Sequence, residues 1–131
     1  MMLFHGTDNP NLKLKPVKDG IGYHPGAGPV EFLGPSFSDN KLVAQTYGKY
    51  LLSKDFKFKK VKQFKSLNVL KNDILKTFAL TSGINLGEQY KDIADSYKIK
   101  LTSDGFDAIT FPEGVKTDTN HLIANTYIPL I

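Results

Sequence analysis

The chain has 131 residues, of which 40% are hydrophobic and 23% are charged, an ordinary composition for one globular domain and too short for two. It contains no cysteine, which excludes disulfides, thiolate nucleophiles and zinc–sulfur sites. The net charge is +4 and all seventeen basic residues are lysines. A phosphate-bearing ligand would therefore be held by point charges, hydroxyls and backbone N–H groups, without the two-pronged grip of arginine.

Nothing in the sequence approaches the roughly 20 consecutive apolar residues of a membrane span. The first residues lack the basic and apolar regions of a signal peptide. We therefore expect a soluble cytoplasmic protein with no membrane partner. The three histidines, His5, His24 and His121, are far apart in the sequence, and we expect no metal site.

The first third of the chain predicts one short strand and a long loop. Residues 2–5 read as a buried strand that ends at Gly6. The stretch Asp8–Pro35 is rich in Pro, Gly and Asn and predicts a loop, in which Leu12 and Leu14 could form a brief strand. Loops of this length in a small domain are usually functional or mobile. We expect this one to be mobile and to border the functional cleft of the domain.

A helix and a strand are expected next. Ser38 or Asp39 is a suitable N-cap for a helix over Asn40–Leu52, whose apolar residues recur at helical spacing: Val43, Tyr47, Tyr50 and Leu51. The segment Phe56–Phe64 begins with strand-like alternation and slips once, which predicts a strand with a bulge.

Two further helices and two strands complete the chain. Ser66 is expected to cap a helix that ends near Gly83, with one apolar face made by Leu67, Leu70, Ile74 and Phe78. The next helix has the face Leu86, Tyr90, Ile93 and Tyr97. The turn Asp104-Gly105 leads into a strand over Phe106–Phe111 that Pro112 stops, and a last strand covers His121–Tyr127. Strands, then helices, then strands predict a single α+β domain over residues 1–131.

Three segments, taken in order, carry a resemblance to a known family. They are Leu3-Phe4-His5-Gly6-Thr7; Gly34-Pro35-Ser36-Phe37-Ser38-Asp39-Asn40 with the following Ala44 and Tyr47-Gly48; and Asp104-Gly105-Phe106-Asp107-Ala108-Ile109. This set resembles the ADP-ribosyltransferase superfamily, especially its small phage and bacterial members with a histidine on the first strand. The resemblance implies an ADP-ribosyltransferase-like α+β fold with strands around a split sheet core and about three helices.

The same resemblance implies a reaction. NAD would be the substrate, cleaved between nicotinamide and ribose through an oxocarbenium-like transition state, and no metal would be needed. ADP-ribose would pass to a macromolecular acceptor, which we expect to be a protein.

Carried over residue by residue, the resemblance gives a set of NAD-binding residues. His5 matches the histidine that binds a ribose hydroxyl, and Gly6 with Thr7 matches the backbone that contacts the nicotinamide amide. Tyr47 matches the tyrosine that stacks on the nicotinamide ring. Ser36, beside Phe37, stands where many members have a second tyrosine.

One family feature is missing from the last strand. Members often carry a glutamate there, whereas this chain reads Asn120-His121-Leu122-Ile123-Ala124-Asn125 and has no carboxylate after Asp118. Glu113 and Asp118, both expected in the preceding loop, are the nearest substitutes. His121 could bind a ribose hydroxyl but could not supply negative charge. The candidate catalytic residues are therefore His5, Glu113 and His121.

Other interpretations of these residues remain open. His5 could be a hydrogen-bonded histidine at a strand end, and Tyr47 could belong to the core. The whole domain could be a non-catalytic binding or virion-associated module on the same fold. The stretch Lys54–Lys65 holds six lysines and one aspartate, which fits either an edge strand kept soluble by charge or a nucleic-acid-binding surface.

Overall fold

The computed structural model describes residues 1–8, 28–77, 86–116 and 121–130. Its elements, in chain order, are β1 (Met2–Thr7), the 3-10 helix η1 (Gly28–Phe32), β2 (Phe37–Ser38), α1 (Lys41–Gln45), β3 (Tyr50–Asp55), β4 (Val61–Gln63), α2 (Leu67–Thr77), α3 (Leu86–Ser103), β5 (Ala108–Lys116) and β6 (His121–Pro129). The α+β class is confirmed. None of the helices within the described ranges is both long and apolar enough to cross a membrane.

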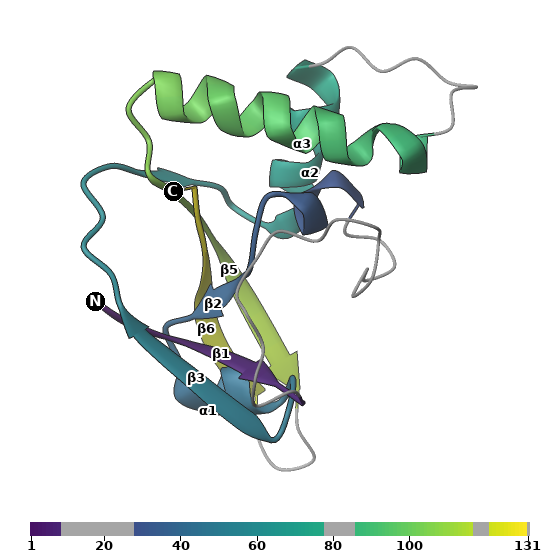
Figure 1. The fold of residues 1–131 in the computed structure, drawn as a ribbon. Helices are drawn as coiled ribbons and strands as arrows, with labels where there is room; N and C mark the ends of the chain where they lie inside the picture. The colour runs from purple at the N-terminus through teal and green to yellow at the C-terminus, as the bar shows by residue number, and fades with distance from the viewer. Residues whose placement is uncertain (9–27, 78–85, 117–120, 131) are drawn as a thin grey trace.

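Six strands form one mixed sheet in the order β3-β1-β2-β6-β5-β4. All neighbouring strands are antiparallel except β4 and β5, which are parallel. The sheet is continuous rather than split, but its middle is narrow, because β2 has two residues and meets β1 at the single pair Phe4↔Ser38. Figure 1 shows the β1–β3 pair running across the β5–β6 pair on either side of this junction.

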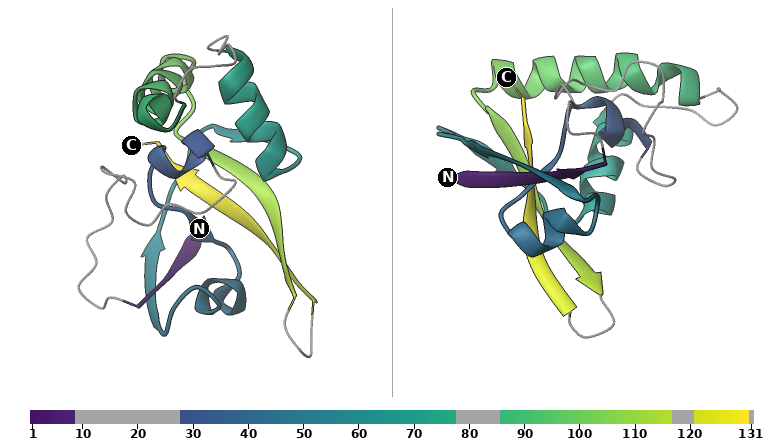
Figure 2. Two further views of the ribbon diagram at one scale, coloured as in Figure 1. Left: turned by 90° about the vertical axis from the view of Figure 1, so that its right-hand side faces the viewer. Right: turned by 60° about the horizontal axis from the view of Figure 1, so that its bottom comes forward.

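The main apolar core lies between η1, α2 and α3 on one side and the β5–β6 half of the sheet on the other. Figures 1 and 2 show α2 and α3 together at one end of the molecule and α1 at the other. The largest side chains of this core that are fully shielded from solvent are Leu33, Leu70, Ile74, Tyr97, Ile109 and Ile128. The Tyr97 hydroxyl also donates a 2.5 Å hydrogen bond to Asp73, which ties α3 to α2.

A smaller apolar region holds the other half of the sheet together. Leu3, Phe37, Val43 and Ala44 are buried, yet they lie outside the main core cluster. They belong to β1, β2 and α1, so this second region joins the short helix to the strands beside it.

The predicted helix over Asn40–Leu52 is confirmed at its start and wrong beyond Gln45. The helix α1 ends at Gln45, and Asn40 caps it in place of Ser38 or Asp39, accepting a 2.9 Å hydrogen bond from the Leu42 N–H. From Tyr50 onward the chain forms β3, which pairs with β1 along six residues. The apolar spacing that looked helical was a short helix and a strand in succession, and strand pairing decided the conformation.

The predicted strand over Phe56–Phe64 is also largely wrong, since only β4 in this segment is a strand. The loop predicted over Asp8–Pro35 ends in η1, and Val30, Phe32 and Leu33 at that end belong to the main core. Residues 9–27 of that loop, with the brief strand expected at Leu12 and Leu14, lie outside the described residues, as does the helix end expected at Gly83.

The two amphipathic helices α2 and α3 are confirmed. Ser66 caps α2 by accepting a 3.1 Å hydrogen bond from the Val69 N–H. After α3 the chain turns at Gly105, whose φ of 91° suits a residue without a side chain. Both following strands are longer than predicted, β5 by five residues beyond Phe111 and β6 by two beyond Tyr127.

Candidate functional site

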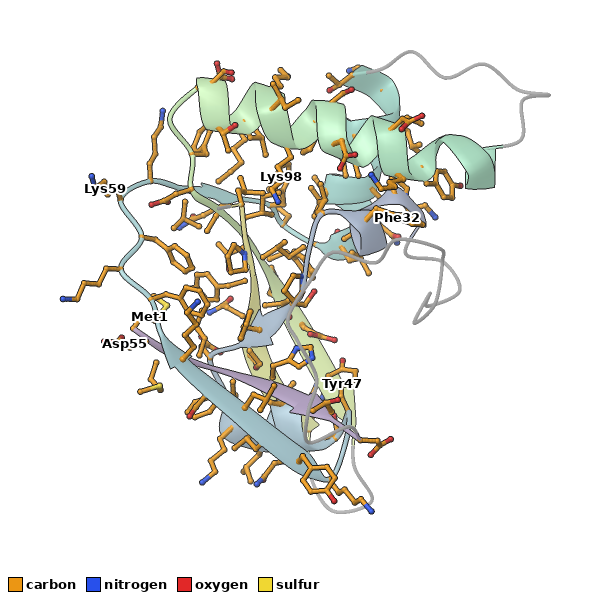
Figure 3. The ribbon with its side chains drawn as sticks, viewed as in Figure 1. Met1, Phe32, Tyr47, Asp55, Lys59 and Lys98 are labelled. Atoms are coloured by element: carbon orange, nitrogen blue, oxygen red, sulfur yellow. The ribbon has the colours of Figure 1, made fainter. Side chains whose placement is uncertain are left out.

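A cluster of three side chains centres on the carboxylate of Glu113. The Tyr47 hydroxyl donates a hydrogen bond to Oε1 of Glu113, and the Thr126 hydroxyl donates one to Oε2. Thr126 is only 4% exposed, whereas Tyr47 is 48% exposed, so the cluster reaches from the sheet to the surface. Figure 3 labels Tyr47 beside the end of β1.

The predicted loop position of Glu113 is wrong, because β5 continues through Pro112. The Thr110 carbonyl accepts a 2.9 Å hydrogen bond from the Phe64 N–H, so the backbone of Thr110 faces the β4 side. Pro112, two residues on, faces the same side, where β4 has already ended at Gln63. A proline that lacks an N–H is tolerated on such an edge. Glu113 is thereby held in the ladder opposite Ala124.

Two close backbone contacts place Tyr47 over β1. A Cβ atom on Gly6 would lie 1.8 Å from the Ala44 carbonyl oxygen, and one on Gly48 would lie 2.3 Å from the carbonyl carbon of Thr7. Both distances are impossible for real side chains, so glycine is required where the end of α1 meets the end of β1. Tyr47 lies between these contacts, in the turn that follows α1. The glycines of two separate sequence motifs thus share one packing role.

The surroundings of Tyr47 keep its hydroxyl protonated. Partial burial raises the pKa of Tyr47 above its usual value of about 10, and the hydrogen bond and negative charge of Glu113 raise it further. The phenol therefore remains a hydrogen-bond donor at physiological pH. Chemically, the cluster offers one carboxylate oriented by two neutral donors.

His5 points away from α1. Side chains alternate along a strand, and Gly6, the next residue, faces α1. The Nδ1 atom of His5 lies 2.6 Å from the Ser36 carbonyl oxygen, and its ring centroid lies 5.6 Å from that of Phe37. Among the described residues no hydrogen bond joins His5 to the Glu113 cluster.

The remaining NAD-binding candidates are structural neighbours of β1. Thr7 is buried at the end of β1, and Phe37 is 3% exposed and packs edge-on against Phe56. The Ser36 side chain is exposed, and its contact with His5 is made through the backbone.

His121 lies on the other face of the β5–β6 hairpin from Glu113. It pairs with Lys116 at the start of β6, and its ring covers Gly114, where an added Cβ would lie 2.9 Å from Nε2. Gly114 and Glu113 are consecutive residues of β5 and therefore face opposite sides. The structure does not bring His121 and Glu113 together, and Asp118 lies outside the described residues.

The sequence interpretation missed the hydrogen bonds of two side chains, Thr126 and Asp39. Thr126 was unremarkable in the sequence, although its alternation with Ala124 along β6 places it on the Glu113 face. Asp39, expected as a helix cap and as part of the second motif, instead binds Asn125: its Oδ1 accepts from the Asn125 backbone N–H at 2.8 Å and its Oδ2 from the side-chain amide at 3.2 Å. Only strand register could have revealed either contact.

The stretch Lys54–Lys65 changes conformation twice. It leaves β3, crosses in irregular conformation from Phe56 to Lys60, and enters β4, a short edge strand, which is one of the two interpretations that the charge pattern allowed. Asp107 accepts hydrogen bonds from the backbone N–H groups of Lys59 and Lys60, at 2.7 and 3.1 Å, and fixes the crossing.

Within the described part of the chain, no three His, Cys, Asp or Glu side chains lie close enough to hold a metal ion. Comparisons with models of protein families, with curated proteins and with solved structures find no match to this chain.

Proposed function

We propose that this domain is an NAD-dependent ADP-ribosyltransferase in which Glu113 is the catalytic carboxylate. The observation that carries the proposal is the cluster itself: a carboxylate on a late strand of the sheet, oriented by the hydroxyls of Tyr47 and Thr126. The ordered sequence motifs around His5, Tyr47 and Asp107 support the same assignment.

The chemistry asked of Glu113 is electrostatic. When the bond between nicotinamide and ribose breaks, nicotinamide leaves with the bonding electrons and positive charge develops on the ribose. A carboxylate that accepts a hydrogen bond from a ribose hydroxyl stabilises that charge, and an acceptor nucleophile then attacks the sugar carbon. Tyr47, with its raised pKa, stays neutral and so does not cancel or add to the charge of Glu113.

NAD is the substrate in this proposal, and its ribose and diphosphate would be bound by different side chains. Glu113 would hold the ribose, and lysines would have to hold the diphosphate, because the chain has no arginine. The acceptor would be a macromolecule, which we take to be a protein. NAD is an intracellular metabolite, consistent with the cytoplasmic location expected from the sequence.

A specific observation favours a second candidate function, a non-catalytic binding module. Both oxygens of Glu113 already accept hydrogen bonds from protein hydroxyls, and His5 faces away from α1 and makes no hydrogen bond to the cluster among the described residues. In that case the cluster would stabilise the junction of α1 with β5 and β6.

Release of nicotinamide from NAD distinguishes the two functions. We expect the purified protein to release nicotinamide slowly, with water as the acceptor. We expect Glu113→Gln to lower the rate about 100- to 1000-fold, because it removes a preorganised charge while keeping the shape. Asp95→Asn is the matched control, since Asp95 lies on α3 and pairs with Lys91.

Two results would count against catalysis by Glu113. Full activity in Glu113→Gln would show that another group supplies the charge. A wild-type protein that binds NAD and releases no nicotinamide would support the binding module.

A further inference from the structure

A second site lies on the opposite face of the β5–β6 hairpin from Glu113. It is a hollow of about 190 Å³ beside β4, lined by Gln63, Phe64, Thr110, Phe111, Pro112, Asn125 and Tyr127. The pairs Thr110↔Tyr127 and Pro112↔Asn125 form its floor. Because neighbouring residues of a strand face opposite sides, Thr110 and Pro112 point away from the face that carries Glu113.

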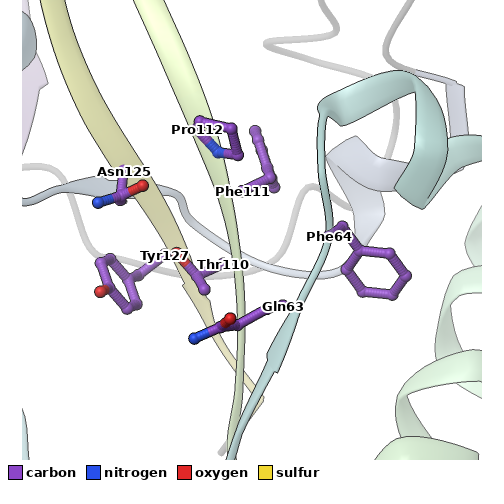
Figure 4. Close-up of a pocket in the computed structure, with 7 residues that line it drawn as sticks. All are labelled: Gln63, Phe64, Thr110, Phe111, Pro112, Asn125 and Tyr127. Atoms are coloured by element: carbon purple, nitrogen blue, oxygen red, sulfur yellow. The ribbon is translucent and has the colours of Figure 1, made fainter.

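The polar groups of this hollow suit a planar heterocycle. Figure 4 shows the amides of Gln63 and Asn125 on either side of Thr110, with the Tyr127 ring beside them. The Asn125 amide nitrogen is bound to Asp39 at 3.2 Å, and Figure 4 shows its carbonyl oxygen turned towards the hollow. Asparagine and glutamine amides match the donor and acceptor edges of nucleobases.

The Tyr127 ring is held in place as a stacking surface. Phe58 stacks on it with centroids 6.0 Å apart and an interplanar angle of 13°. Phe56 stacks on Phe58 at 5.2 Å, so the crossing segment supports the tyrosine through two successive rings. An aromatic ring fixed in this way loses little conformational entropy when a base stacks on it.

Beside the hollow runs the basic stretch Lys54–Lys65, which we call the lysine strip. Its six lysines include Lys57, Lys59 and Lys65, whose side chains are exposed, and none of the six pairs with a carboxylate among the described residues. The strip's one aspartate, Asp55, binds the N-terminal amine at 2.8 Å. Asp107 is occupied by backbone N–H groups, and Asp39 by Asn125. Positive charge thus dominates the strip.

We propose that the hollow and the lysine strip together bind single-stranded nucleic acid, with one base in the hollow against Tyr127 and phosphates along the strip. A base stacked within a duplex could not enter a hollow of this kind, so the site favours single strands. Lysine contacts to phosphate are independent of sequence and weaken with salt. This site is separate from the Glu113 cluster and does not depend on the proposed transferase activity.

Fluorescence anisotropy of labelled 12-residue oligomers tests this proposal on the full chain. We expect oligodeoxythymidine, oligouridine or both to bind at low salt, and a duplex of equal length to bind at least about 10-fold more weakly. The stronger of the two single strands identifies DNA or RNA as the ligand. For three phosphate contacts, log K should fall with log[salt] with a slope of about −2.

Two sets of variants locate the contacts. We expect the triple variant Lys57→Ala, Lys59→Ala, Lys65→Ala to bind more weakly and to lose most of the salt dependence. The control triple variant Lys41→Ala, Lys76→Ala, Lys100→Ala has the same net charge but changes lysines outside the strip, and it should bind as the wild type does.

Variants of the hollow test the base site. We expect Tyr127→Ala to weaken binding about 10- to 100-fold. Because Tyr127 also packs against Phe58, Gln63→Ala, an exposed change on β4, tests the hollow without risk to the fold.

Several outcomes would overturn the proposal. Absence of binding at low salt, or equal losses in the two triple variants, would remove the lysine strip as a nucleic-acid site. Equal affinity for duplex and single strand, together with wild-type affinity in Gln63→Ala and Tyr127→Ala, would remove the hollow as a base site.

Discussion

At the scale of single residues, two tyrosine–carboxylate pairs connect distant parts of the chain. Tyr47 links the end of α1 to Glu113 in β5, and Tyr97 links α3 to Asp73 in α2. In both pairs burial and the neighbouring carboxylate raise the pKa of the phenol. The Tyr97 pair is the more protected, since Tyr97 has no exposed surface.

The Tyr97 pair predicts a loss of stability at alkaline pH. Unfolded tyrosine has a pKa of about 10, and the folded pKa is higher, so the folded state holds this proton more tightly. The contribution to stability is therefore complete below pH about 10 and is lost as the pH rises through the folded pKa. Between pH about 10 and the folded pKa, each further pH unit lowers the free energy of unfolding by about 1.4 kcal/mol through Tyr97.

Urea denaturation of Tyr97→Phe measures this effect. At pH 7 we expect the variant to be about 1.5 kcal/mol less stable, because the hydrogen bond to Asp73 is gone. Above pH 10 the difference should shrink. Tyr50→Phe, at an exposed tyrosine, is the control and should track the wild type. A pH-independent difference for Tyr97→Phe would rule out the linkage.

At the scale of elements, the position of α1 depends on backbone contact with β1. Gly6 and Gly48 permit that contact, and Asn40 starts the helix. A helix of five residues has little stability of its own, so packing must hold it. Tyr47, and with it one donor to Glu113, is consequently placed by two glycines.

Alanine at Gly6 tests this dependence. Its Cβ would meet the backbone oxygen of Ala44, which cannot move aside independently, so we expect Gly6→Ala to cost about 3 kcal/mol or more in unfolding free energy. Gly114→Ala is the matched control. Its Cβ would meet only the exposed His121 ring, which can rotate away, and the change should stay within about 1 kcal/mol. Equal costs measured by thermal denaturation would show that α1 adjusts to a side chain at Gly6.

The same elements explain which parts of the fold were predictable. The helices α2 and α3 have a long apolar periodicity, and the caps and turns at Ser66 and Gly105 are local features. In contrast, β3 forms because β1 is available as its partner, and β5 continues past Pro112 because its outer edge is free beyond Gln63. Such decisions are made by contacts between distant residues, so a local pattern could not predict them.

The candidate site was predictable to a similar extent. Tyr47 and Glu113 were both selected from the sequence, but their contact depends on the length of β5 and on the turn after α1. Thr126 enters the site through the register of β6. The separation of His121 from Glu113 also follows from register, because a shift by one residue exchanges the two faces of a strand.

At the scale of the whole molecule, the two halves of the sheet have different support. The main core is built from η1, α2, α3, β5, β6 and the residues that follow them, and no residue of β1, α1 or β3 belongs to it. Within the sheet, the half formed by β3 and β1 is joined to β6 through the two residues of β2, and the Tyr47–Glu113 hydrogen bond is a further link between the end of α1 and β5. Regions with fewer buried contacts open at lower free energy than the core.

We therefore predict that β1, β3 and α1 open as a unit before the rest of the molecule unfolds. Hydrogen exchange under native conditions should give β3 amides a smaller opening free energy than amides of β5, β6 and α3.

Ile74→Val provides the decisive comparison, since Ile74 lies in the main core and the change costs about 1 kcal/mol. It should lower the opening free energy of α3 and leave that of β3 unchanged, because the Ile74 contacts survive when β3 opens. Val43→Ala, in α1, should lower the opening free energies of both regions, since every opening breaks its contacts. If Ile74→Val lowered the opening free energy of β3 as much as that of α3, the two halves would unfold together as one cooperative unit.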